Sequence, residues 1–153
     1  NFKFPGRVKR PATDPINAML SFCFSLLHSE IHTQILIAGL DPYIGFLHEQ
    51  SYGHAALASD FTEIFRGLVE HFALKSLNRK EFGIEDFEEE TGGAVKLSRS
   101  GFQKFFPKWA EFLRKEKIFG ELNLTRLIER NVRSFVHYLM GDEEDFHPFI
   151  WKI

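Results

Sequence analysis

The sequence predicts a mainly α-helical domain, a multi-helix bundle that carries a small β-hairpin or loop insertion. Three observations support this fold class. Long segments between proline and glycine residues repeat apolar side chains at a spacing of three or four residues, which is typical of helices. The chain has 153 residues, 44% hydrophobic and 26% charged, which suits one domain with its own core. Phenylalanine occurs 18 times, so we expect aromatic packing to fill that core.

The chain is expected to begin with an extended basic arm or linker over residues 1–13, and the helical domain should occupy residues 14–153. The arm contains several lysines and arginines and is punctuated by prolines. Thr13 or Asp14 stands directly before Pro15, which is the pattern of a helix N-cap followed by proline at the first helical position. A helix should therefore start at this point.

The first helix is expected to run to Ala38 and to end at Gly39, a residue type that favours the helix C-terminus. Its apolar residues cover most of its circumference, so other helices should surround it. The later elements follow between polar or glycine-containing turns, and an apolar tail over residues 146–151 should pack back on the body. The expected elements are helices over residues 55–77, 98–118 and 122–140, a short helical turn over 82–87, and a hairpin or loop over 91–97.

The cysteine content and the hydropathy pattern indicate a cytoplasmic protein that does not span a membrane. Cys23 is the only cysteine, it lies between two phenylalanines, and it has no second thiol with which to pair. We expect it to be buried and inert. The longest apolar stretch, residues 16–40, is interrupted by serine, histidine and glutamate, which argues against a transmembrane helix.

The charge distribution leaves a nucleic-acid partner open. The formal net charge of −2 does not by itself indicate one. Between Arg99 and Arg133, however, there are nine lysines or arginines and four glutamates. Such a local basic surface can bind phosphate, but a helix face of mixed charge is more often simply solvated.

One group of polar residues could carry chemistry. His48 lies at an expected turn, and Asp60, Glu63 and Arg66 follow at helical spacing on the second helix. An imidazole together with carboxylate oxygens can hold Mg²⁺ or Mn²⁺. The same spacing also fits an acidic first turn, an ion pair between Glu63 and Arg66, and a histidine of the core. Spacing alone does not decide between these interpretations.

Three longer motifs resemble those of a known family, the CRISPR-associated spacer integrase, and in particular its helical C-terminal catalytic domain. Residues 14–22 (DPINAMLSF) resemble the motif that opens its first helix. Residues 39–48 (GLDPYIGFLH) resemble the motif that carries its metal-binding histidine, and residues 56–66 (ALASDFTEIFR) resemble the motif that supplies acidic ligands. The three matches occur in the family's order and at its spacing.

The resemblance implies a metal-dependent DNA endonuclease and integrase of CRISPR adaptation, acting in a prokaryotic cytoplasm. In this family the 3′-hydroxyl end of a spacer DNA attacks a phosphodiester of the CRISPR repeat. The implied cofactor is Mg²⁺ or Mn²⁺. The implied partners are DNA (the protospacer and the CRISPR repeat), the second CRISPR-associated adaptation protein and, in the intact protein, a second copy of the chain, with no membrane partner.

Carried over to this sequence, the resemblance gives roles to individual residues. His48 and Asp60 would be metal ligands, and Glu63 would be a second acidic residue that binds the metal or supports its ligands. Arg66 would neutralise the phosphate. Asn17, in the first motif, would support the structure around the site.

The charge pattern suggests a further phosphate-binding track that runs from Arg66 along the second helix. Lys75, Arg79 and Lys80 gather at the end of that helix. They are our candidates for the track, although cations at a helix C-terminus also suit the helix dipole.

Two family features are not found in the sequence, a β-rich N-terminal domain and an upstream glutamate that is another metal ligand. We therefore expect this chain alone to bind divalent metal weakly and to be largely inactive as an integrase. The alternative interpretation is a non-catalytic helical module that binds DNA or another protein.

Overall fold

The computed structural model describes residues 2, 6–8, 11–48 and 52–150. Parts of three expected features lie outside the described residues. These are positions 1, 3–5 and 9–10 of the basic arm, positions 49–51 of the loop before the second helix, and Trp151 with the two residues after it at the end of the tail.

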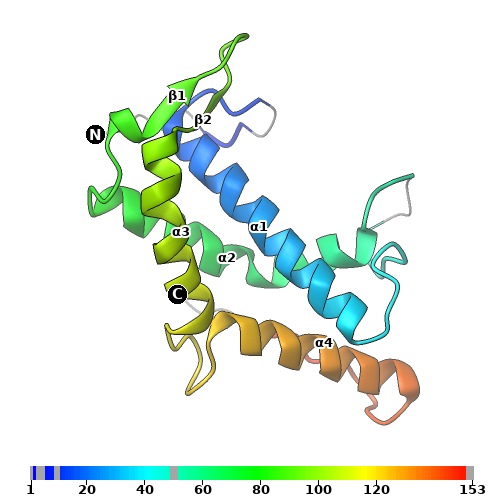
Figure 1. Ribbon diagram of the computed structural model, residues 1–153. Helices are drawn as coiled ribbons and strands as arrows, with labels where there is room; N and C mark the ends of the chain where they lie inside the picture. Colours follow the sequence, from blue (N-terminus) through cyan, green and yellow to red (C-terminus); the bar gives the residue numbers. More distant parts are fainter. Residues whose placement is uncertain (1, 3–5, 9–10, 49–51, 151–153) are drawn as a thin grey trace.

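The expected helices and hairpin are confirmed, with differences at their ends (Figure 1). The elements are α1 (Pro15–Ile37), α2 (Ala56–Asn78), the 3₁₀ turn η1 (Ile84–Asp86), β1 (Phe87–Glu89), β2 (Val95–Leu97), α3 (Arg99–Arg114) and α4 (Leu124–Met140). The strands pair antiparallel with Phe87 opposite Leu97. No described helix is long and apolar enough to cross a lipid bilayer.

The prediction that α3 extends to residue 118 is wrong. A tight turn in which Phe119 pairs with Leu122 follows the helix, and Gly120 takes a positive φ of 58° within it. Asn123 then caps α4, because its side chain accepts a hydrogen bond from the backbone N–H of Arg126. The connection between α3 and α4 is therefore longer than the position of Gly120 in the sequence suggests.

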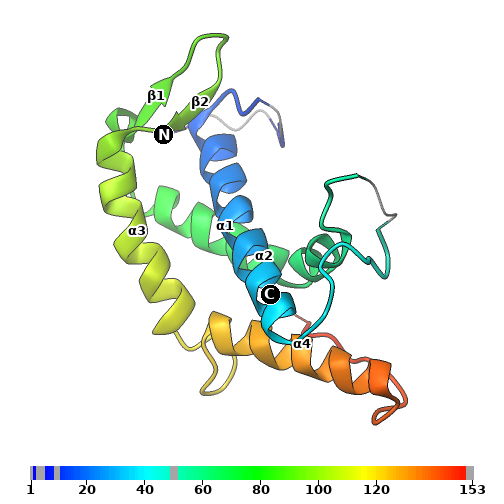
Figure 2. The same ribbon diagram turned by 45° about the vertical axis from the view of Figure 1, so that its right-hand side comes forward.

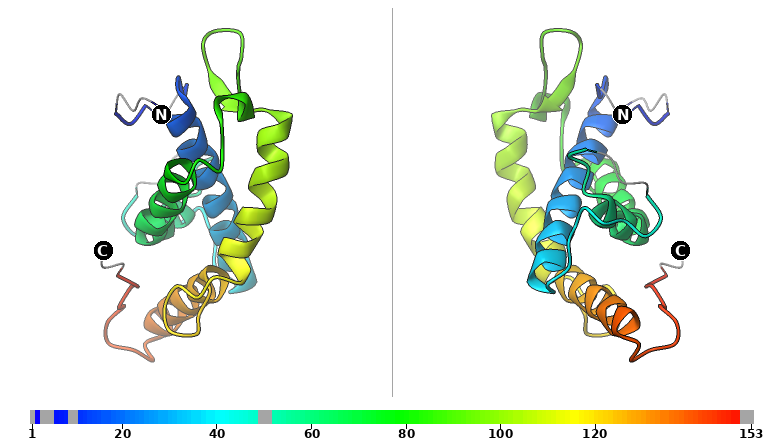
Figure 3. Two further views of the ribbon diagram at one scale, coloured as in Figure 1. Left: turned by 90° about the vertical axis from the view of Figure 1, so that its left-hand side faces the viewer. Right: turned by 90° about the vertical axis from the view of Figure 1, so that its right-hand side faces the viewer.

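The helices form a layered arrangement in which α1 runs through the middle (Figures 1 and 2). It packs along α2 on one side, and α3 lies on the other side, beneath the hairpin (Figure 3). Helix α4 crosses the end of this group and contacts both α1 and α3. The long loop between α1 and α2 therefore lies at one end of the molecule, away from the hairpin.

The start of α1 is fixed by its own first residues. Asp14 is the N-cap, and its side chain accepts a hydrogen bond from the backbone N–H of Asn17, while Pro15 opens the helix. The fully buried side chain of Asn17 binds the N-terminal arm, because its amide donates to the carbonyl of Gly6 and its oxygen accepts from the backbone of Val8. Asn17 therefore holds the N-terminal arm against the start of α1.

The expectation that α1 is surrounded on all sides is wrong. A buried stripe that includes Cys23, Leu27 and Ile31 faces the core, but Ser25 and Ser29 are exposed on another face. Leu36 and Ile37 at the helix C-terminus are exposed as well. One face of α1 is therefore free to line a groove.

Aromatic side chains fill the core, as the phenylalanine content predicts. Phe72 stacks on Phe112 with ring centroids 4.6 Å apart, and Phe105 stacks on Trp109 at 5.7 Å. Cys23 is fully buried, and burial raises the pKa of its thiol far above the ordinary value, as expected for an inert residue. In the tail, Phe149 packs against the core and its backbone N–H donates to Asn131.

The hairpin is anchored to α3 by a buried carboxylate. Asp86 has no exposed surface, and it accepts hydrogen bonds from Lys104 Nζ at 2.6 Å, Ser100 Oγ at 3.0 Å and the Gly83 backbone N–H at 2.9 Å. Its carbonyl oxygen lies so close to Gly101 that a Cβ there would come within 2.2 Å of it. Glycine at position 101 therefore allows α3 to start directly against this turn.

Replacing Asp86 with asparagine should destabilise the fold at neutral pH by about 1–3 kcal/mol, because buried donors lose their ionised acceptor. Burial alone would raise the pKa of Asp86, but hydrogen bonds from Lys104, Gly83 and Ser100 hold it below its ordinary value. The carboxylate therefore contributes stability above the unfolded pKa of about 3.9, and this contribution is lost as the pH falls through the lower folded pKa. Urea unfolding across this acid range should show a smaller pH dependence in Asp86→Asn. The exposed Glu88→Gln is the control and should behave as the unsubstituted chain does.

Candidate functional site

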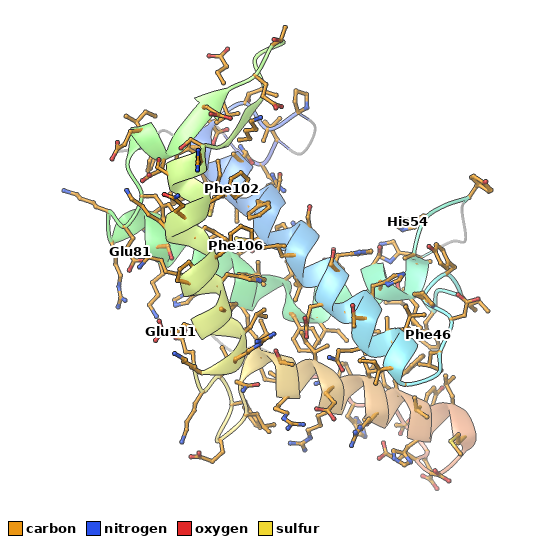
Figure 4. The ribbon with its side chains drawn as sticks, in the orientation of Figure 1. Phe46, His54, Glu81, Phe102, Phe106 and Glu111 are labelled. Atoms are coloured by element: carbon orange, nitrogen blue, oxygen red, sulfur yellow. The ribbon has the colours of Figure 1, made fainter. Side chains whose placement is uncertain are left out.

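An open groove of about 880 Å³ lies between α1, α2 and the loop that joins them. The loop end of the groove is marked in Figure 4 by His54, whereas Phe102 and Phe106 lie along α3 at a distance from it. Two groups of side chains line the groove, one from α1 and one from α2 with its preceding loop. The lining residues used below are Arg7, Phe24, His28, His48, Glu63 and Arg66.

The loop before α2 is folded around the carboxylate of Asp60. Oδ2 of Asp60 accepts from the backbone N–H groups of Phe46 (2.6 Å) and Leu47 (2.9 Å), and Oδ1 accepts from that of His48 (3.0 Å). Gly45 permits this tight turn, since a Cβ there would lie 2.5 Å from the His48 carbonyl oxygen and 2.6 Å from the Ala56 Cβ. The motif at residues 39–48 is thus a loop that closes on the first turns of the next helix.

The electrostatics of Asp60 follow from these donors. Its side chain is 7% exposed, and burial alone would raise its pKa. Hydrogen bonds from the Leu47 backbone, the His48 ring and the Phe46 and His48 backbones outweigh burial and lower the pKa of Asp60. Asp60 is therefore ionised at neutral pH and strongly held in place.

His48 lies directly against Asp60, as the spacing of the two motifs predicted. Its Nδ1 is 2.5 Å from Oδ1 of Asp60, and its side chain is 44% exposed. The interpretation of His48 as a core histidine is therefore wrong. Because an ionised carboxylate only accepts hydrogen bonds, it fixes the proton of a neutral ring on Nδ1. The lone pair of Nε2 is then available to the groove.

Glu63 and Arg66 form an ion pair one turn farther along α2. Arg66 Nη1 lies 3.2 Å from Glu63 Oε2, and Arg66 Nε lies 3.0 Å from Glu70 Oε1. Hydrogen bonding to Glu70, followed by that to Glu63, raises the pKa of Arg66. The carboxylate of Glu63 is 54% exposed, so it is accessible at the groove wall.

The three predicted metal ligands lie in one region, where His48 and Glu63 line the groove, but they do not form a coordination cluster. His48 and Asp60 are joined, whereas Glu63 is turned to Arg66. Within the described ranges, no three histidine, cysteine, aspartate or glutamate side chains come together closely enough to hold a metal ion. All four acceptor positions of the Asp60 carboxylate are engaged by protein donors, which leaves His48 Nε2 and Glu63 as the accessible ligand atoms.

The expected phosphate track from Arg66 to the end of α2 is not continuous. Lys75 and Arg79 line a different pocket, against α3, and Lys75 pairs with Glu116 at 3.4 Å. Lys75 follows Arg66 by about two and a half helical turns, which places it on the opposite side of α2. Lys80 lies beyond the C-terminus of the helix, where its φ is 57°. These basic residues are close together in the sequence, but the turn of the helix places Arg66 on one face of α2 and Lys75 on another.

Several groove residues were not singled out from the sequence. Arg7 belongs to the N-terminal arm, and His28 comes from α1, where burial is the main cause that lowers its pKa. The signal in α1 is a row of hydroxyl residues at every fourth position, on the same helix face as its histidines. The row consists of Ser21, Ser25, Ser29 and Thr33.

Comparison with known proteins gives the family context of the chain. Residues 1–111 match the family described as CRISPR associated protein Cas1. A CRISPR-associated endonuclease Cas1 of Thermodesulfovibrio yellowstonii is 42% identical over 118 residues, which cover 76% of this chain and 37% of that protein. The chain spans less than two thirds of the length of the curated relatives it matches.

Solved structures share the fold as well. A casposase bound to its integration product superposes with a TM-score of 0.87 and 28% identity, over 99% of this chain and 47% of that one. A chain of a Cas6-RT-Cas1–Cas2 complex superposes with a TM-score of 0.81 and 26% identity, over 98% of this chain and 17% of that one. Family match, relatives and structural neighbours agree, and the chain belongs to the Cas1 family of CRISPR-associated endonucleases.

Proposed function

We propose that this domain binds a divalent metal ion, Mg²⁺ or Mn²⁺, in the groove and carries the DNA integrase and endonuclease site of a CRISPR adaptation protein. The observation that carries the proposal is the pairing of His48, which lines the groove, with the buried Asp60, while the accessible Glu63 lines the same groove. A carboxylate suits both metals, which prefer hard oxygen donors and leave room for water or phosphate, and one imidazole can complete such a ligand set.

The contacts of Asp60 suggest a role that differs from direct ligation. In many metal sites a carboxylate accepts the second ring N–H of a histidine ligand, which fixes its orientation and increases its basicity. We assign this positioning role to Asp60, and we assign metal ligation to Nε2 of His48 and to Glu63. Asp60 also holds the backbone of residues 46–48, so it positions both the ring and the loop that carries it.

Arg66 has two carboxylate partners and can keep one of them while Glu63 turns to the groove. If Glu63 ligates a cation, the Arg66 guanidinium remains held by Glu70 and presents Nη1 to the groove. It can then donate to a phosphate oxygen of the DNA. The metal, when bound, would polarise the scissile phosphate and stabilise the leaving oxygen, so the chain needs no nucleophile of its own.

The partners are proposed from the structural neighbours of the chain. The casposase structure contains an integration product, and another neighbour is a complex that includes Cas2. We propose DNA with free 3′-hydroxyl ends as the substrate, a Cas2-type protein as a partner, and a homodimer in the full-length protein. The match to the Thermodesulfovibrio yellowstonii relative covers 37% of that protein, so these partners are proposed for the full-length protein.

The test is a strand-transfer and nicking assay with the full-length protein on branched DNA. We expect product with Mn²⁺ or Mg²⁺ and none in EDTA, because the proposed chemistry needs a cation to neutralise the phosphate. Salt-sensitive DNA binding with no product under any metal condition would favour the non-catalytic DNA-binding alternative instead.

A further inference from the structure

Arg7 in the N-terminal arm carries a positive charge into the groove without an ion-pair partner among its hydrogen bonds. Its Nη1 donates to the Val8 carbonyl (2.8 Å) and to Asn17 Oδ1 (2.9 Å), and its Nη2 donates to Ser21 Oγ (3.1 Å). All three acceptors are neutral. The side chain is therefore rigidly placed, but its charge is not matched by a contacting carboxylate in the described structure.

The guanidinium also has donors left over. A guanidinium has five N–H donors, and three are used here. Nε of Arg7 is buried and has no hydrogen-bond partner within the described residues. A buried donor that lacks an acceptor is unfavourable, so an oxygen that reached Nε would remove this cost.

Arg7 and Arg66 approach the same aromatic ring. Their Cζ atoms lie 5.8 and 5.4 Å from the centroid of Phe24, within the range of cation–π attraction. Both arginines line the groove that contains His48 and Glu63. Burial, and next the nearby charge of Arg66, lower the pKa of Arg7, and the more weakly acting charges of Glu70 and Asp14 only partly offset this. Two cations held this close favour an anion beside them.

We propose that Arg7 is a phosphate-binding residue of the groove, which together with Arg66 holds the backbone of the DNA strand whose phosphodiesters enter the site. This inference rests on the proposed function, since it takes DNA as the occupant of the groove. Free N–H donors of one guanidinium suit the oxygens of a phosphodiester, which accept hydrogen bonds in pairs. Asn17 and Ser21, at the start of α1, position the Arg7 side chain.

The experiment measures DNA binding by the full-length protein in EDTA, so that no metal chemistry is required. The probe is a short duplex with a 3′ overhang, titrated at several salt concentrations. Arg7→Ala should weaken binding about 10- to 100-fold at low salt. It should also reduce the slope of log K against log salt by about one, the signature of one lost phosphate contact. Lys96→Ala, on the exposed face of β2 outside the groove, is the matched control and should leave both values unchanged.

A second set of probes separates phosphate binding from a purely structural tether of the arm. Each probe replaces one phosphate by an uncharged methylphosphonate. At one phosphate position, the methylphosphonate should weaken DNA binding by the unsubstituted protein. The same probe should not weaken DNA binding by Arg7→Ala any further. Ser21→Ala, which removes a tether without removing charge, should keep the full salt slope.

Three outcomes would overturn the proposal. They are an unchanged salt slope in Arg7→Ala, the same methylphosphonate profile in both proteins, and Arg7-dependent binding of inorganic phosphate with unaltered DNA binding. None of these depends on catalysis, so strand transfer by the unsubstituted protein would still stand if they occurred. Conversely, a protein that never transfers strands but shows the Arg7 effects would retain the phosphate site and lose the proposed enzymatic function.

Discussion

Replacing His48 with alanine in the full-length protein should reduce strand transfer by more than about 100-fold, the upper end of the effect that supporting residues have in metal sites. The reason is that His48 presents Nε2 to the groove while Asp60 holds its Nδ1 at 2.5 Å. Loss of the ring removes a proposed metal ligand, so the effect should exceed that of removing a residue that only positions a ligand. Product formation from a branched substrate, measured in Mn²⁺, is the appropriate readout.

The control for this variant is His28→Ala, which removes another histidine of the same groove that is not a proposed ligand. It should retain most of the strand transfer. Circular dichroism should show that both variants remain helical, since the His48 side chain is 44% exposed. Ordinary strand transfer by folded His48→Ala would contradict its assignment as a ligand.

Glu63→Gln and Asp60→Asn should differ in whether added Mn²⁺ restores strand transfer. Glu63→Gln removes the proposed carboxylate ligand, so Mn²⁺ binding and strand transfer should both be lost. Adding excess Mn²⁺ should not restore either of them. Asp60→Asn alters the support of the histidine, so the affinity for Mn²⁺ should fall by about 10- to 100-fold. Excess Mn²⁺ should then restore part of the strand-transfer activity.

The comparison is made by titrating Mn²⁺ calorimetrically and by measuring strand transfer at rising Mn²⁺ concentrations. Glu70→Gln is the matched control, because Glu70 contacts the same arginine as Glu63 but does not line the groove. It should bind Mn²⁺ as the unsubstituted protein does. The reverse pattern, with Glu63→Gln rescued and Asp60→Asn beyond recovery, would make Asp60 the ligand and Glu63 the supporting residue.

The sequence alone was sufficient for the elements that depend on local chemistry. The N-cap at Asp14, the stop at Gly39 and the glycine turn of the hairpin are each set by a few neighbouring residues. The contact of His48 with Asp60 could also be anticipated, because two recognisable motifs carry them at a short separation. Local rules and motif spacing therefore identified most of the fold and the centre of the site.

The remaining features depend on three-dimensional contacts that spacing does not encode. Asp60 receives three backbone N–H groups from a loop more than ten residues earlier, which changes its proposed role from ligand to support. Arg7 reaches the groove only because buried Asn17 binds the arm. Arg66 and Lys75 line different pockets because residues close together along a helix can lie on opposite faces of it.

The most direct test of the metal centre is a crystal structure of the full-length protein with Mn²⁺, analysed by anomalous diffraction at the manganese edge. Our assignment predicts a peak in the groove about 2.1 Å from Nε2 of His48 and from a carboxylate oxygen of Glu63, with Asp60 still bound to Nδ1. A peak coordinated by Asp60 in place of Glu63, or one remote from the His48 ring, would contradict it.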